Sequence, residues 1–263
     1  MSIQLLISTM HQTDHSLLDR MNVRCDAVVV NQCDRCETEI FEYNGHTIKW
    51  ISMPERGVGL SRNTALYNAT ADIVLFADDD MRYNDDYVEN VIGAFEKNKK
   101  AEVICFNVEL VNSMKKFGHR LNKSEKRLRF YNSMRYGACL IGARRKVLLK
   151  NRISFSLLFG GGAEFSCGED SLFIKDCLEK KIKMYSHPYI LGSVEDSQSS
   201  WYQGVNDKLF TDKGILLTSA FPVIHKLLFV YYAYKMRRMD AKYGFKRIIK
   251  LFYYGSKLIK KYR

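Results

Sequence analysis

Short apolar segments alternate with amphipathic ones along the first half of the chain. The apolar segments are rich in Ile, Val, Leu and Phe and five to eight residues long, which is typical of buried parallel strands. We predict five strands, at Gln4–Ser8, Ala27–Asn31, Thr47–Met53, Ile73–Ala77 and Val103–Leu110.

Two segments between these strands have the spacing of amphipathic helices, Leu60–Asn68 and Asp86–Lys97. Helices that alternate with strands form crossover connections, so the predicted fold class is α/β, with a central sheet flanked by helices. No repeat, low-complexity tract or Pro/Gly-rich linker interrupts this part of the chain. We therefore predict one catalytic domain over residues 1–220, followed by a tail.

The tail, residues 221–263, contains two apolar stripes at helical spacing. The stripes are Leu227, Val230, Tyr231 and Tyr234, followed by Phe245, Ile248, Ile249 and Phe252. The polar faces are basic and the last thirty-eight residues include ten aromatics, which is typical of amphipathic helices that lie on an anionic membrane surface. Helices that pack on the body and leave their charges in water would have the same pattern.

The formal net charge of +12 is concentrated in two segments. Residues 226–263 contain twelve Lys or Arg and one acid, and residues 115–152 contain thirteen and one. These segments carry +11 and +12, which leaves −11 on the rest of the chain. Basic surfaces on an acidic body indicate an anionic partner, and they argue against a nucleic-acid-binding protein, which would be basic throughout.

The sequence shows neither an export signal nor a membrane-spanning run. No apolar run reaches the roughly 18 residues that cross a bilayer, and the start MSIQLLIST lacks a basic segment and a cleavage site. The seven cysteines are scattered and odd in number, which is typical of reduced thiols. We therefore expect a cytoplasmic protein. Because its tail is basic and amphipathic, we also expect it to be peripheral on the inner face of the cell membrane.

Three consecutive carboxylates, Asp78, Asp79 and Asp80, follow the predicted strand that ends at Ala77. Ligands of open α/β sheets bind beyond the carboxyl ends of the strands, so these acids stand where a site is expected. If the chain stays extended, Asp78 and Asp80 point the same way. Mg²⁺ or Mn²⁺ between them would relieve their repulsion, with substrate phosphates completing its coordination. A solvated acidic turn would show the same triplet.

Two glycine-containing segments flank this triplet along the chain. RGVGLSRN, residues 56–63, combines a tight glycine turn at a helix start with the charged donor fork of Arg62, and both features favour phosphate. FGGGAEFSCGED, residues 159–170, offers flexible backbone and then Glu169 and Asp170 at the start of a helix. Carboxylates are stabilised there by the helix dipole, and one of them could also accept a proton from an attacking hydroxyl.

Taken in this order, the segments LSRN at 60–63, Asp78–Asp80 and Gly168-Glu169-Asp170 resemble the motifs of the family 2 glycosyltransferases, which are nucleotide-sugar enzymes. The resemblance covers about residues 3–215. It implies the Rossmann-like GT-A fold with a mostly parallel central sheet. It also implies a metal-dependent single displacement with inversion at the anomeric carbon.

The resemblance further implies roles for individual residues. Asp170 would be the general base for the acceptor hydroxyl, with Glu169 helping to position the acceptor or the base. Asp78 and Asp80 would bind the divalent cation, Mn²⁺ or Mg²⁺. The residues that would bind the nucleotide-sugar, with a UDP-sugar as the usual expectation, are Ser8, Thr9, Asn31, Gln32, Arg62, Asp78 and Asp79. The residues themselves suggest the candidates on the acceptor side: Gly161 and Gly162, whose backbone can approach a ligand closely, and Trp201, which could stack on a sugar ring or pack in the core.

We predict an inverting glycosyltransferase that moves a sugar from a nucleotide-diphosphate sugar to a hydroxyl of a glycan or lipid-linked glycan in cell-surface polysaccharide synthesis. A basic acceptor side suits a lipid-diphosphate-linked glycan, because both the diphosphate and the membrane are anionic. Two alternatives remain open. A metal-dependent nucleotidyl- or phosphotransferase would have similar carboxylates, although the chain has no GxxxxGK loop. A non-enzymatic module that binds nucleic acid or membrane would explain the basic segments alone.

Overall fold

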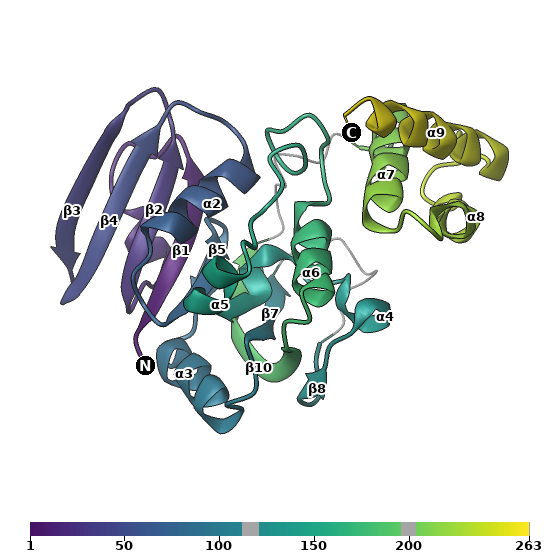
Figure 1. The fold of residues 1–263 in the computed structure, drawn as a ribbon. Helices are drawn as coiled ribbons and strands as arrows, with labels where there is room; N and C mark the ends of the chain where they lie inside the picture. Colours follow the sequence, from purple (N-terminus) through teal and green to yellow (C-terminus); the bar gives the residue numbers. More distant parts are fainter. Residues whose placement is uncertain (112–120, 196–203, 263) are drawn as a thin grey trace.

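A mixed β-sheet forms the centre of the protein (Figure 1). The computed structural model describes residues 1–111, 121–195 and 204–262, and within these ranges ten strands join one sheet. Their order is β3-β4-β2-β1-β5-β9-β7-β10-β6, with the short β8 paired to β10. The strands are β1 (Ile3–Met10), β2 (Asp26–Gln32), β3 (Glu37–Tyr43), β4 (His46–Met53), β5 (Ile73–Asp78), β6 (Met81–Tyr83), β7 (Val103–Val111), β8 (Lys126–Arg127), β9 (Ile141–Arg144) and β10 (Met184–Glu195).

Parallel pairing joins β4, β2, β1 and β5 into one block, and it also joins β7 to β10. The intervening β9 runs antiparallel to β5 and β7, and the remaining pairings, of β3, β6 and β8, are also antiparallel. All five predicted strands are confirmed, in β1, β2, β4, β5 and β7. The parallel block includes the strand ends where ligands of α/β sheets bind.

Helices flank the sheet and extend the molecule beyond it. They are α1 (Leu17–Met21), α2 (Val58–Asn68), α3 (Tyr87–Lys97), α4 (Phe130–Ser133), α5 (Arg145–Lys150), α6 (Glu169–Glu179), α7 (Asp207–Ala220), α8 (His225–Met236) and α9 (Phe245–Leu258). The two helices predicted between the early strands are confirmed, in α2 and α3. Across the described ranges, no helix combines the length and apolar character needed to cross a membrane.

Each face of the sheet has its own apolar core, because successive strand residues point to opposite sides. Leu5 and Ile7 of β1 belong to a core that includes residues of α1 and α3. Leu6, between them, belongs to a second core with residues of α2, α5 and α6. Burial on both faces explains why the central strands are continuous apolar runs in the sequence. It also holds the strand ends, and the side chains on them, in fixed positions.

The helices α7, α8 and α9 form a bundle at the opposite end of the molecule from β3 (Figure 1). Its core includes Phe210, Phe229 and Phe252, all fully buried. The backbones of α7 and α9 touch at Gly214, where a Cβ atom would lie 2.4 Å from the carbonyl oxygen of Phe252. The bundle therefore includes α7 and begins before residue 221, where the sequence analysis starts the tail.

The two apolar stripes predicted in the tail have different surroundings. In α9, Ile248 and Phe252 are fully buried in the bundle. In α8, Phe229 and Ala233 are buried instead, whereas Leu227 and Tyr234 of the predicted stripe are exposed. Helix α8 therefore packs on the bundle through a different face from the predicted stripe.

Candidate active site

The carboxyl ends of β1 and β5 bring predicted site residues together. The parallel register places Ser8 of β1 beside Asp78 of β5. Two helices complete the site, α2 through Arg62 and α6 through Glu169 and Asp170 in its first turn. Segments about a hundred residues apart in the sequence thus meet at one edge of the sheet.

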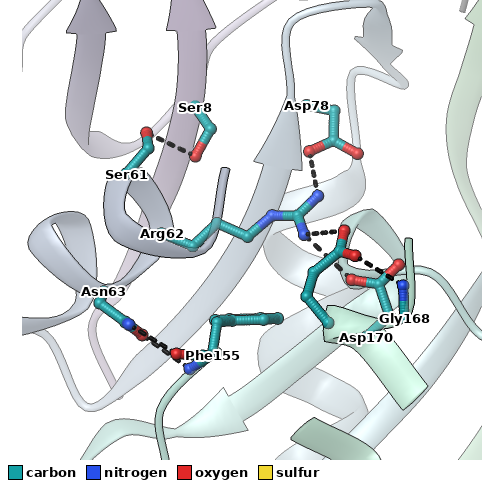
Figure 2. A network of polar contacts seen from close by, with 9 residues as sticks. Ser8, Ser61, Arg62, Asn63, Asp78, Phe155, Gly168 and Asp170 are labelled. Atoms are coloured by element: carbon teal, nitrogen blue, oxygen red, sulfur yellow. Dashed lines mark hydrogen bonds and ion pairs between the residues drawn. The ribbon is translucent and has the colours of Figure 1, made fainter. Parts of the chain in front are cut away.

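Arg62 lies at the centre of this site and binds three carboxylates (Figure 2). Its Nη2 lies 2.7 Å from Oδ1 of Asp78. Its Nη1 lies 3.0 Å from Oδ1 of Asp170 and 3.2 Å from Oε1 of Glu169. The Arg62 side chain is only 5% exposed, so these are contacts of a buried cation.

The carboxylates around Arg62 keep its guanidinium protonated. Burial alone would lower the pKa of Arg62, but the carboxylates of Asp78, Asp170 and Glu169 raise it above the ordinary value. One cation among three carboxylates leaves a net charge of −2 when all four groups are ionised. This excess favours a bound cation beside the cluster.

Asp170 combines partial exposure with an unusual protonation equilibrium. Its side chain is 27% exposed, so it is open to a ligand while still contacting Arg62. Burial raises the pKa of Asp170 to about 7, with Glu169 and Asp78 adding to the effect and Arg62 opposing it. A carboxylate with a pKa near neutrality can accept a proton from a hydroxyl group and release it again, which is the requirement for a general base.

Glu169 is more deeply buried and is fixed on several sides. Its Oε2 accepts a hydrogen bond from the backbone nitrogen of Gly168 at 3.1 Å. Gly160 lies directly against its carboxyl group, since a Cβ at Gly160 would be 2.8 Å from Cδ of Glu169. The next residue, Gly161, accepts a hydrogen bond from the backbone of Val58 at the start of α2. Glu169 is thus positioned to hold Arg62, which in turn contacts Asp170.

Gly161 and Gly162, predicted on the acceptor side, lie in the loop between α5 and α6. Gly161 is buried by its contact with the start of α2, and Gly162 is exposed. The third acceptor-side candidate, Trp201, lies outside the described residues. Of the three, Gly162 is the one that the described structure leaves open to a ligand.

The acidic triplet does not continue the extended strand. Strand β5 ends at Asp78, and Asp79 and Asp80 form the turn to β6, where both are exposed. The alternation expected for an extended chain is therefore absent here. Asp79 accepts a hydrogen bond from the hydroxyl of Thr9 at 2.6 Å, which joins the ends of β1 and β5.

Three other predicted nucleotide contacts are buried and engaged within the protein. Ser8 accepts a hydrogen bond from the hydroxyl of Ser61 at 2.9 Å. Asn31 pairs through both amide atoms with the backbone of Gln12. Gln32 accepts from the backbone nitrogen of Gly57 at 2.7 Å. In this arrangement the three side chains fix the loops around the site.

The sequence analysis does not identify two residues that lie close to the site. Gln12 donates to the hydroxyl of Thr9 at 2.9 Å, and its place just beyond a strand end is a signal that would have pointed to it. Cys139 lies near the acidic residues: burial raises the pKa of its thiol well above the ordinary value, and the charges of Asp78, Asp170 and Asp80 add to this. No feature of the sequence around Cys139 indicates this position.

Asn63 also has a role that the sequence does not reveal. Its side chain donates to the backbone oxygen of Phe155 at 2.9 Å and accepts from the backbone nitrogen of the same residue at 2.8 Å (Figure 2). The guanidinium of Arg62 lies over the ring of Phe155, 5.2 Å from its centre. Asn63 thus fixes the backbone of Phe155, and the ring of Phe155 supports the guanidinium of Arg62.

Asp78 and Asp80 offer the hard oxygen donors that Mg²⁺ and Mn²⁺ prefer. In the part of the chain that the structure describes, no three His, Cys, Asp or Glu side chains are grouped as a metal site would require. Mg²⁺ is commonly held by one or two carboxylates, with water and substrate phosphates completing its coordination. Two aspartates at the end of a strand and in the turn after it therefore fit such an ion.

The structure is similar to solved structures of TarS from S. aureus. TarS 1–349 in complex with UDP-GlcNAc has a TM-score of 0.63 at 14% identity, over 93% of this chain and 75% of the TarS chain. The complex with UDP gives 0.60 at 15% identity over 93% and 74%, and TarS 1–349 alone gives 0.61 at 13% over 100% and 92%. The likeness confirms the predicted fold, a central sheet flanked by helices as in GT-A enzymes.

Among curated proteins, none matches this chain in sequence. The family described as "Glycosyl transferase family 2" matches residues 7–151, which is more than half of the chain. The matched range includes Arg62 and the acidic triplet and ends before Asp170. The resemblance stated from the motifs is confirmed, and the chain belongs to glycosyl transferase family 2.

Proposed function

We propose that this glycosyltransferase moves a sugar from a UDP-sugar to a hydroxyl of a glycan or lipid-linked glycan, with inversion at the anomeric carbon. The observation that carries the proposal is the Arg62 cluster, in which one guanidinium contacts both Asp78 at the strand end and Asp170 on α6. A candidate donor-binding carboxylate and a candidate base therefore lie on either side of one side chain. TarS, which shares the fold, binds UDP-GlcNAc and UDP, and this supports a UDP-sugar as the donor.

On the donor side, Asp78 and Asp80 would hold Mn²⁺ or Mg²⁺. The ion, when bound, would neutralise charge on the diphosphate as it departs. Asp79 and Thr9, already joined by a hydrogen bond, would contact the nucleotide beside it. Arg62 is always charged, so it would add a second positive group near the diphosphate.

On the acceptor side, Asp170 would take the proton of the attacking hydroxyl. As the acceptor oxygen bonds to the anomeric carbon, the bond from that carbon to the diphosphate oxygen breaks, and its electron pair leaves with the diphosphate. Attack from the side opposite the leaving group inverts the configuration. Glu169, held by Gly168 and Arg62, would keep Asp170 in position.

We further propose that the acceptor is presented at the inner face of the cell membrane during cell-surface polysaccharide synthesis, with the enzyme bound peripherally. The segregated charge supports this proposal, because the two basic segments carry +11 and +12 on an otherwise acidic chain. A lipid-linked diphosphate and anionic headgroups would both be attracted to such segments.

Calorimetric titration with UDP, in the presence and absence of Mn²⁺, tests the donor and metal roles together. We expect Mn²⁺-dependent binding that is lost in Asp80→Asn. The matched control is Glu96→Gln, which removes an exposed carboxylate from α3 and should bind as the unmodified protein does. If UDP does not bind under any condition, or binds equally to Asp80→Asn, the proposed donor site is wrong.

A further inference from the structure

Helix α8 carries a large apolar surface that no other part of the described chain covers. Leu227 is 73% exposed, Tyr231 58%, Tyr234 55% and Val230 54%. In the turn just before the helix, Val223 is 91% exposed. We call the surface formed by residues 223, 224, 227, 230, 231 and 234 the outer face of α8.

The outer face is a single strip along the helix. At about 100° per residue, its helical positions fall within an arc of roughly 120°. The opposite side of α8 packs into the bundle through Phe229 and Ala233, both fully buried. The exposed strip therefore cannot turn inward unless the bundle core is broken.

Basic side chains border the outer face on both sides. Lys226 and Arg237 lie along one border, Lys235 lies along the other, and all three are exposed. The guanidinium of Arg237 lies over the ring of Tyr234, 3.9 Å from its centre. The helix itself, residues 225–236, contains no acidic residue. An apolar strip between cationic borders is complementary to a surface with an apolar interior and anionic headgroups.

We infer that the outer face of α8 binds an anionic lipid bilayer, with Leu227 and Val230 entering the headgroup region and Tyr231 and Tyr234 lying at its level. Tyrosine rings favour this zone because one end is apolar and the other polar. The basic borders contact the headgroups, and each Lys or Arg strengthens attachment by roughly fivefold. The predicted stripe of α9 is not the contact, because Ile248 and Phe252 are fully buried and Phe245 and Ile249 are half-buried.

This inference specifies the membrane-surface part of the proposed function, and it does not depend on the sugar transfer. The full chain is sedimented with vesicles of phosphatidylcholine, alone or mixed with phosphatidylglycerol. We expect binding to the mixed vesicles only, weakened by high salt because the basic borders are screened. Leu227→Glu should lower the partition coefficient by roughly tenfold or more, since it places a charge in the headgroup–acyl boundary.

The matched control is Ile40→Glu, which makes the same change at a residue of β3 that is 68% exposed, and it should bind as the unmodified protein does. Both substitutions are at exposed positions and should leave the melting temperature unchanged. The inference is overturned if the unmodified protein stays in the supernatant, or if Leu227→Glu binds equally well. It is also overturned if sedimentation without lipid shows a dimer that Leu227→Glu dissociates, because the face would then bind a second copy. UDP titration of Leu227→Glu separates these outcomes from a failure of the donor site.

Discussion

Arg62 places one positive charge among carboxylates that come from two distant parts of the chain. Asp170 lies in the first turn of α6, where the helix dipole alone would lower its pKa. Its pKa is nevertheless raised to about 7, because burial and the charges of Glu169 and Asp78 outweigh Arg62. The same neighbours that make Asp170 a suitable base therefore make its charged form unfavourable in the folded protein.

This balance gives the stability of the protein a specific pH dependence. In the unfolded chain Asp170 ionises near its ordinary pKa of 3.8, whereas in the folded protein it ionises near 7. Between these values the unfolded state loses the proton first, so this group lowers stability progressively from about pH 4 to about pH 7 and by a constant amount above. Asp170→Asn removes the penalty. We expect calorimetry to show a larger gain in melting temperature for this variant at pH 8 than at pH 5.

The control for this experiment is Asp176→Asn, on the exposed side of the same helix, where the side chain is 46% exposed. Its effect on the melting temperature should not grow from pH 5 to pH 8 as that of Asp170→Asn does. An equal gain for Asp170→Asn at the two pH values would contradict the raised pKa.

At the scale of elements, the loop from Phe159 to Gly168 connects the site to both α2 and the bundle. It receives a hydrogen bond from Val58 at the start of α2. At its other end, Ser166 donates from its backbone and its hydroxyl to Asp212 of α7, at 2.9 and 2.6 Å. Asp212 is buried and also binds Lys208. The first turn of α6 is therefore held from two directions.

Gly160 is a position in this loop where a small change should be damaging to the site. It has a φ of +105°, and a Cβ there would lie 2.7 Å from Cγ1 of Val58 and 2.8 Å from the Glu169 carboxyl carbon. Gly160→Ala therefore combines backbone strain with overpacking, and we expect a loss of about 2 to 4 kcal/mol in the free energy of unfolding. UDP release from a UDP-sugar should also fall, because Glu169 is displaced. Denaturant unfolding and an activity assay check both effects.

Gly45→Ala distinguishes backbone strain from overpacking as the cause of the damage. Gly45 also has a positive φ, of +78°, but a Cβ there would meet nothing within 4 Å. This variant should lose only about 1 kcal/mol and keep full activity. If the two alanine variants behave alike, the contact between Gly160 and Glu169 has no importance for the site.

At the scale of the whole molecule, the bundle is joined to the catalytic part through α7. Phe159 and Phe165 of the loop before α6 pack with Ile215 and Leu216 of α7. A Cβ at Gly168 would lie 2.6 Å from a methyl carbon of Leu216, so α7 also contacts the residue before Glu169. The contact of the bundle with lipid, inferred for α8, would thus be made by a unit that also supports the site.

Truncation after residue 220 tests this connection. Removing α8 and α9 uncovers Phe210 and Leu217 of α7, which are now buried in the bundle core. We expect the shortened protein to aggregate or to melt at a lower temperature than the full chain, because a large apolar surface is exposed. A soluble product with an unchanged melting temperature, checked by scanning calorimetry, would show that α7 is stable without the other two helices.

Much of the sheet could be predicted because its central strands are buried on both faces and are therefore apolar runs. The missed strands lack this signal. In β3 the residues are exposed or half-buried, β9 has only four residues, and β10 contains Pro188 and Gly192 with irregular pairing to β7. These strands depend on pairing partners that lie far away in the sequence.

The sequence could indicate which residues belong to the candidate site, but it could not indicate how they contact one another. The order of motifs pointed to Arg62, the aspartates at the end of β5 and in the turn after it, and the acidic pair of α6. Nothing in the sequence indicated that Arg62 bridges these acids, because the contact with Glu169 spans 107 residues and exists only once α2 and α6 are placed against the sheet. The partners of Asn31 and Gln32 were unpredictable for the same reason.

Transfer by Asp170→Asn is the measurement that tests the central claim most directly. UDP release from UDP-N-acetylglucosamine and other UDP-sugars is followed with Mn²⁺ and a prenyl-diphosphate-linked sugar as acceptor, alongside UDP titration of each variant. We predict that Asp170→Asn binds UDP as the unmodified protein does but loses transfer by about 100-fold or more, because a general base acts in the transition state. Asp176→Asn should retain both properties. Full transfer by Asp170→Asn, with UDP binding intact, would contradict the assignment of Asp170 as the base.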